Sequence, residues 1–257
     1  MKALRNLLLA AIAVFVGICS YAQTTTVKDD LNKAQALFKD GKPEEASAVY
    51  LDLMGKYPKN REAVQGWLMV NMKRSPTGEQ DAIKQLEELE KTYPDNTGIL
   101  FFKTFIQAEY NQMDAAVKNT EKLVTLEPED GTNWLMRGQL LENLGRNEEA
   151  LTAYQKSTEL TPGNADSWQN LAGLQAKNGK LDEAIAAFTK AIDLAPSQPV
   201  FIYNRGCCYS RKGDKANALA DLGKAVSMNP QFKSYAPTDP DFKSLWDDPD
   251  FKKIITL

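Results

Sequence analysis

Two adjacent cysteines, Cys207 and Cys208, are the residues with the most obvious potential for chemistry. The chain contains no histidine, which is the commonest general base and metal ligand. Neighbouring residues of a helix point about 100° apart, so a disulfide between these two cysteines would be strained. Because histidines and a second thiol pair are both missing, a metal or redox role is disfavoured. We expect one cysteine to pack between helices and the other to face a groove, with an intermolecular disulfide as the alternative in an oxidising compartment.

Aspartates gather near the C-terminus and raise the question of a calcium site. They are Asp239, Asp241, Asp247, Asp248 and Asp250. Their spacing does not match the twelve-residue calcium loop with its central glycine. Residues 239–243 and 248–252 both read Asp-Pro-Asp-Phe-Lys, which places a capping aspartate before proline and an acid in the first turn. This pattern predicts two short helices.

Enzyme chemistry would need a nucleophile, a base, a metal or a bound cofactor. The sequence has no strand-to-helix serine motif and no glycine-rich phosphate loop. Carboxylates are plentiful, but pairs such as Glu87 and Glu88 fall on solvated helix faces. We therefore predict a non-enzymatic protein with no cofactor and no metal.

The elements that position all these residues follow a repeat of 34 residues. One alanine and one proline recur in phase, with a single two-residue shift. The series are Ala46, Ala82, Ala116, Ala150, Ala184 and Ala218, and Pro58, Pro94, Pro128, Pro162, Pro196 and Pro230. Glycine stands where a first helix would end, at Gly41, Gly145, Gly179 and Gly213, with Asn111 in the third copy. Each proline stops a second helix. The period predicts pairs of antiparallel helices stacked in an array.

On these residues the chain resembles the tetratricopeptide repeat (TPR) family. The best copy carries Trp168, Leu171, Gly179, Ala184, Phe188, Ala191 and Pro196. The resemblance implies an all-α fold, a right-handed α-solenoid of helix-turn-helix repeats with a short C-terminal helical cap. The six repeats would be 27–60, 61–96, 97–130, 131–164, 165–198 and 199–230, and the cap 231–257. A cap is expected because the end of a solenoid would otherwise expose its core.

In this family the first helices of successive repeats line a concave groove, which implies a protein–protein interaction scaffold. The matching partner-binding positions are Leu31, Gln35, Gln65, Met69, Phe101, Phe105, Leu135, Gln139, Gln169 and Tyr203. They are mainly apolar or amide-bearing, so the lysine and asparagine clamp with which some members hold a chaperone terminus is not reproduced. Such a set suits an extended or helical peptide. Alternatively, Phe101 and Phe105 simply complete the packing of an irregular third repeat.

The two-residue shift affects this assignment in the second repeat. We place the extra residues at 75–78, Ser-Pro-Thr-Gly, which has the chemistry of a turn. This register buries Trp67 between helices and turns Gln65 and Met69 toward the groove.

The first residues have the features of a secretory signal peptide. Lys2 and Arg5 precede an apolar run over 7–18 and a Ser-Tyr-Ala cleavage site. We expect cleavage after Ala22, giving a signal peptide of 1–22, a linker of 23–26 and an exported, periplasmic protein. The end of the segment resembles signal peptides of Bacteroidetes-type bacteria. Alternatives are an uncleaved anchor, although the run is short for a membrane span, and lipidation at Cys19, although Ile18 departs from the lipoprotein pattern.

Charge indicates which partners the chain could bind. Loss of residues 1–22 removes two positive charges and changes the net charge from −3 to −5. No basic stripe is present, so a nucleic-acid partner is disfavoured and a protein or peptide partner is expected. A second hypothesis, from another class, is a structural subunit or assembly factor of a cell-envelope complex, lipid-anchored if Cys19 is modified.

Overall fold

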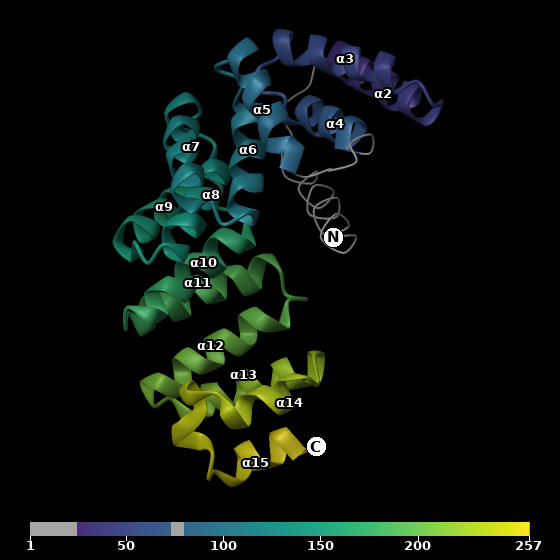
Figure 1. Cartoon of the computed structure of the whole chain (residues 1–257). Helices are drawn as coiled ribbons and strands as arrows, with labels where there is room; N and C mark the ends of the chain where they lie inside the picture. The colour runs from purple at the N-terminus through teal and green to yellow at the C-terminus, as the bar shows by residue number, and fades with distance from the viewer. Residues whose placement is uncertain (1–24, 73–79, 257) are drawn as a thin grey trace. The chain divides into compact units, whose positions relative to one another are not determined.

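The computed structural model describes residues 25–72 and 80–256 (Figure 1). This part of the chain is built from helices and short connections, with no β-strand. The predicted all-α solenoid of helix-turn-helix repeats with a C-terminal cap is confirmed. The predictions for the signal peptide, for Cys19 and for the inserted turn at 75–78 lie outside the described residues. Among the described helices, none is both long enough and apolar enough to cross a bilayer.

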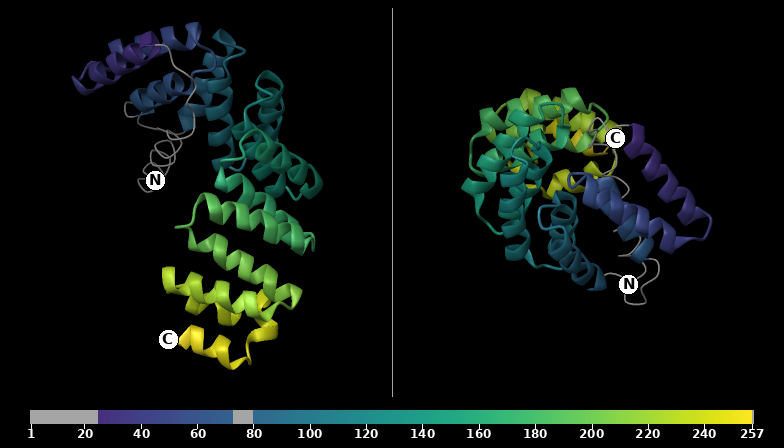
Figure 2. Two further views of the ribbon diagram at one scale, coloured as in Figure 1. Left: turned by 180° about the vertical axis from the view of Figure 1, so that it is seen from behind. Right: turned by 90° about the horizontal axis from the view of Figure 1, so that it is seen from above.

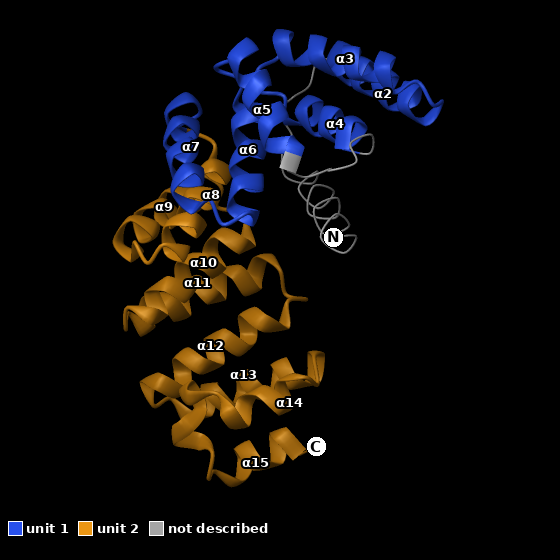
Figure 3. Cartoon of the chain, in the orientation of Figure 1, with its two compact units in different colours: residues 1–128 blue, residues 129–257 orange. Residues whose placement is uncertain are grey.

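The chain divides into two compact units, residues 1–128 and 129–257 (Figure 3). Unit 1 contains α2 (Thr25–Lys39), α3 (Pro43–Lys56), α4 (Arg61–Met72), α5 (Gln80–Thr92), α6 (Thr97–Glu109) and α7 (Met113–Leu126). Helix α3 packs on both α2 and α4, and α6 packs on α4, α5 and α7. Helix α2 starts at Thr25, inside the stretch expected to be a linker. Threonine is well suited to a helix start, and no glycine or proline interrupts residues 24–27.

Unit 2 contains three helix hairpins followed by the C-terminal segment. The hairpins are α8 (Gly131–Asn143) with α9 (Asn147–Leu160), α10 (Ala165–Lys177) with α11 (Leu181–Leu194), and α12 (Pro199–Lys212) with α13 (Lys215–Met228). They are stacked in this order (Figure 2). The segment that follows contains α14 (Phe232–Tyr235), η2 (Ala236–Thr238), η3 (Pro240–Leu245) and α15 (Pro249–Thr256). It packs on the last hairpin, η3 against α12 and α15 against α13.

The repeated residues determine where each helix starts and ends. In every pair the second helix ends two residues before the proline that recurs in each repeat, as at Leu160 before Pro162. The turn between helices needs a left-handed residue: Gly145 has a φ of +73°, and Asn111 has +58° in the repeat that lacks the glycine. Asparagine is the non-glycine residue that best tolerates this conformation.

Small residues allow the paired helices to approach. The six alanines that recur in the repeats have no exposed surface. Gly138 has the same function between α8 and α9, because a Cβ atom there would lie 2.5 Å from the ring of Tyr154. These positions explain why the period is visible in the sequence: a larger side chain would push the two helices apart.

Ala184→Leu is therefore expected to lower the free energy of unfolding of unit 2 by about 1–3 kcal/mol, because it overpacks a fully buried contact. Urea denaturation followed by circular dichroism measures the change. Lys177→Leu is the control, since Lys177 is exposed and its ion pair with Glu142 lies at the surface. Equal losses in both variants would contradict this packing.

Candidate functional site

A cleft of about 340 Å³ lies in unit 1 between α2, α3 and α4. Its lining residues are Gln35, Phe38, Lys39, Tyr50, Glu62, Gln65, Gly66 and Met69. Three of the ten predicted partner-binding residues, Gln35, Gln65 and Met69, are therefore brought together. Helices α2 and α4 are in contact and run in the same direction (Figure 1). Residues one period apart, such as Gln35 and Met69, consequently face the same side.

The second repeat has the register that the sequence predicted. Trp67 is buried with 8% of its surface exposed, whereas Met69, two residues later, is 37% exposed. A shifted register would exchange these two environments. The residues of α4 that line the cleft are thus in phase with those of α2.

The floor of the cleft is made by Tyr50 and Gly66. A Cβ atom on Gly66 would lie 2.3 Å from the Tyr50 ring and 2.7 Å from its hydroxyl oxygen, so only glycine lets this ring lie against α4. Tyr50 is 3% exposed, and burial raises the pKa of its phenol. The prediction missed Tyr50 because it considered first helices only. The sequence does contain a pattern that could have indicated Tyr50. It stands four residues after the recurring alanine, a position at which Tyr154 and Phe188 are also aromatic.

Two charged residues at the cleft were also missed by the prediction. Lys39 lies at the end of α2 and Glu62 in the first turn of α4. Neither makes an ion pair or hydrogen bond with the residues that the structure describes. Lys39 therefore reaches the cleft from the C-terminal end of α2 and Glu62 from the N-terminal end of α4.

Other predicted residues of unit 1 belong to its core. Leu31 and Phe101 are both 3% exposed, and Phe105 is half-buried. The guanidinium of Arg61 lies over the Phe101 ring at 4.2 Å from its centroid, and Arg61 forms an ion pair with Glu127 at 3.2 Å. Phe101 is thus covered on this side. It packs within the third repeat, as the alternative hypothesis for this residue stated. Aromatic residues at helical spacing gain most by burial, and the irregular third repeat has room for them.

In unit 2, Leu135 is buried, Gln139 is exposed and Gln169 is half-buried. The prediction that Tyr203 faces a partner needs correction, because the C-terminal segment covers this residue. Its ring stacks on Phe232 with centroids 4.5 Å apart, and its hydroxyl donates to Asp239 at 2.8 Å. Tyr203 is 6% exposed and joins the cap to the last repeat, so it offers no surface to a partner in this conformation.

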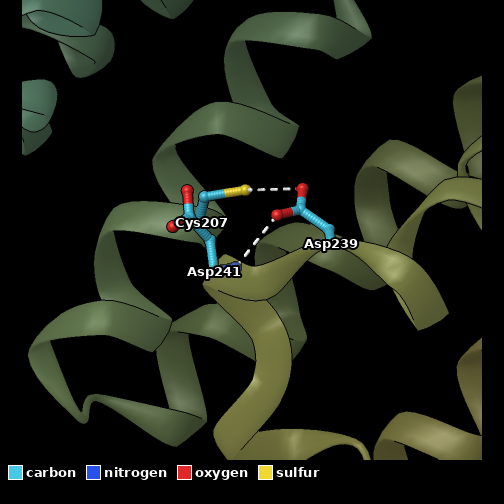
Figure 4. Close-up of side chains that lie close together, drawn as sticks. All are labelled: Cys207, Asp239 and Asp241. Atoms are coloured by element: carbon cyan, nitrogen blue, oxygen red, sulfur yellow. Dashed lines mark hydrogen bonds between the residues drawn. The ribbon is translucent and has the colours of Figure 1, made fainter.

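Close to Tyr203, the fold brings Cys207, Asp239 and Asp241 together (Figure 4). One potential ligand atom from each residue lies within 4.8 Å of the others, a juxtaposition that the sequence analysis did not foresee. The Cys207 thiol donates to Asp239 Oδ2 at 3.7 Å, and Asp239 Oδ1 accepts the backbone N–H of Asp241 at 3.0 Å. The predicted N-capping role of Asp239 is therefore confirmed. Its carboxylate oxygens are used within the fold, and we interpret the cluster as the joint between the cap and α12.

The cysteines are expected to be unreactive in the folded chain. Both are buried, and burial raises the pKa of Cys208 to about 11 and that of Cys207 further. At pH 8, alkylation by iodoacetamide should be at least about tenfold slower in the native chain than in urea, because the thiolate is the reactive form. Mass spectrometry gives both rates. Equal rates in native and unfolded protein would contradict this burial.

Comparison with known proteins agrees with this architecture. A tetratricopeptide repeat model matches residues 111–165 and 135–199, and a second such model matches 201–232. Residues 111–199 and 201–232 therefore contain tetratricopeptide repeats. No curated protein shows significant sequence similarity to it.

Solved structures share the TPR fold at low sequence identity. A crystal structure of MamA is 22% identical with a TM-score of 0.58, covering 63% of this chain and 95% of that one. YrrB, a TPR protein with an unusual peptide-binding site, is 20% identical with a TM-score of 0.51, covering 82% and 91%. The APC/C hetero-tetramer Cut9–Hcn1 is 16% identical with a TM-score of 0.57, covering 88% of this chain and 44% of that one. These likenesses concern the fold alone.

Proposed function

We propose that this TPR protein is a non-enzymatic interaction scaffold that binds a peptide segment of a partner protein in the cleft between α2, α3 and α4. The observation that carries the proposal is the cleft itself. Residues from two successive first helices, Gln35 with Gln65 and Met69, line one cavity. That a protein of the same fold, YrrB, has a peptide-binding site supports the proposal.

The lining has the chemistry of peptide recognition. Phe38 and Met69 supply apolar surface, and the thioether of Met69 can adapt to different side chains. The amide group of Gln35 can pair with the backbone of an extended peptide. A volume of about 340 Å³ is at the small end of ligand pockets, enough for one large side chain with the adjoining backbone.

Met69→Glu tests the function, because it places a carboxylate on the exposed apolar wall of the cleft. Partner proteins retained from native extract by the immobilised chain should be lost in this variant, since truncation or disruption of an anchor costs about 2 kcal/mol or more of binding. Leu194→Glu is the matched control: Leu194 is 43% exposed and lies in unit 2, outside the cleft. Retention of the same proteins by the Met69→Glu variant, with unchanged circular dichroism, would rule out the cleft as the binding site.

We further propose that the chain is exported and that Gln23 is its mature N-terminus, as residues 1–22 indicate. Intact-mass measurement of the protein from its native host should give the mass of residues 23–257, allowing for cyclisation of Gln23. A mass that includes a lipid on Cys19 would overturn this proposal.

A further inference from the structure

We infer that the cleft recognises an extended peptide in which a bulky apolar residue lies between a basic group and an acidic group. The basic group would pair with Glu62 and the acidic group with Lys39. This inference rests on the proposed function and specifies the chemistry of the partner segment.

The two charges are the first argument. Lys39 and Glu62 line the cleft and have no ionic partner in the part of the chain that the structure describes. One is a cation at the C-terminal end of α2 and the other an anion at the N-terminal end of α4, and both line the same cleft. A ligand with two like charges would meet repulsion at one end, whereas a ligand with opposite charges is complementary to both.

The Tyr50 hydroxyl is the second argument. The Tyr50 side chain is 97% buried, because 3% of it is exposed, and it lines the cleft. Its hydroxyl makes no hydrogen bond within the described residues, where burial is the only cause of its raised pKa. The hydroxyl oxygen is not one of the fully buried unpaired atoms of the described residues, so it is accessible from the cleft and can pair with a ligand group there. A backbone carbonyl of a peptide would accept this hydrogen bond at the centre of the cleft.

The apolar wall is the third argument. Phe38 and Met69 face the cleft from α2 and α4, and Met69 is one of the few large hydrophobic residues with more than a third of its surface exposed. Between two unpaired charges, this wall suits one apolar side chain of the peptide. An extended peptide advances about 3.3 Å per residue, so a five-residue segment can carry the apolar residue at its centre and a charge at each end.

Short synthetic peptides test the inference directly. The probe is the acetylated, amidated peptide Lys-Gly-Leu-Gly-Asp, labelled for fluorescence anisotropy and titrated with the chain from Gln23 to Leu257 at low ionic strength. Two controls carry like charges, Lys-Gly-Leu-Gly-Lys and Asp-Gly-Leu-Gly-Asp. The third, Lys-Gly-Gly-Gly-Asp, has glycine in place of the central leucine. We expect the probe to bind about 3- to 10-fold more tightly than each control. Added salt should reduce its advantage over the like-charged controls.

Charge reversal at the cleft provides the sharper result. In the Lys39→Glu variant the preference should switch to the doubly basic peptide, and in Glu62→Lys to the doubly acidic one. Both residues lack ionic partners, so neither substitution breaks an interaction within the described fold. Tyr50→Phe removes one hydroxyl and should weaken binding of the probe about 2- to 10-fold at an unchanged melting temperature.

Equal affinity for the four peptides, or the same order of affinities in all charge-reversed variants, would overturn the inference. So would the failure of the probe to bind at about 1 mM, the weak end of useful affinity. These outcomes are distinct from failure of the proposed function. If Met69→Glu abolishes partner capture while the peptides show no charge preference, the cleft is the binding site and only the peptide chemistry is refuted.

Discussion

Glu127→Ala is expected to lower the free energy of unfolding of unit 1 by about 3–5 kcal/mol. The Glu127 and Arg61 side chains are 5% and 8% exposed, and their charged groups are 3.2 Å apart. Removal of the carboxylate breaks this ion pair at the buried Arg61 guanidinium, which lies over the ring of Phe101. A buried charge without its partner is among the most costly defects a fold can carry. Urea denaturation monitored by circular dichroism measures the loss.

The double variant Arg61→Met with Glu127→Leu distinguishes the cost of leaving one charge of the ion pair from the cost of removing both charges. Apolar replacements of similar volume remove both charges, and such exchanges are often nearly neutral. We therefore expect the double variant to be more stable than Glu127→Ala, with a large coupling energy between the two sites. If the double variant loses as much stability as the sum of the single changes Arg61→Met and Glu127→Leu, the two sites are not coupled and this account of the ion pair is wrong.

The second large effect is expected from Phe242→Ala, which should destabilise unit 2 by about 3–5 kcal/mol. Phe242 has no exposed surface and is the centre of an aromatic cluster. Its ring lies 5.5 Å from that of Tyr203 and 5.9 Å from that of Phe251, measured between centroids. Truncation leaves a cavity beneath the cap. Because each layer of a repeat protein is supported by its neighbours, amide hydrogen exchange should rise first in α12 and α13.

Tyr235→Ala is the control within the same segment. Tyr235 is also aromatic, but it is 60% exposed, so its loss should change stability by less than about 0.5 kcal/mol. Similar losses in the Phe242 and Tyr235 variants would indicate that the C-terminal segment does not act as a cap. Unchanged hydrogen exchange in α12 after Phe242→Ala would lead to the same conclusion.

The helices and their pairing were predictable from the sequence because local rules determine them. Proline cannot continue a helix, so each recurring proline ends one regardless of how the rest of the chain packs. Glycine, or Asn111 in its place, supplies the left-handed turn. Alanine such as Ala184 leaves the space that two close helices need. These are properties of single residues at fixed spacing, and they could be read without the structure.

Exposure of the groove-facing residues was not predictable in the same way. Tyr203 and Phe101 occupy the same repeat position as Gln65, but they are buried and Gln65 lines a cleft. The difference comes from residues distant in sequence: the C-terminal segment folds over Tyr203, and Arg61 with its partner Glu127 covers Phe101. A periodic pattern indicates which side of a helix a residue faces, and it contains no information about what else packs on that side.

The candidate site shows the same division. The sequence by itself determined that Gln35, Gln65 and Met69 share one face of two neighbouring helices, because they are in phase with a single period. Only the tertiary structure decided that this face is a cleft with Tyr50 as its floor and with Lys39 and Glu62 in its lining. The physical reason is that a cleft depends on the distance between helices. That distance was decided at Gly66, where the missing side chain lets the Tyr50 ring from another helix lie within contact distance.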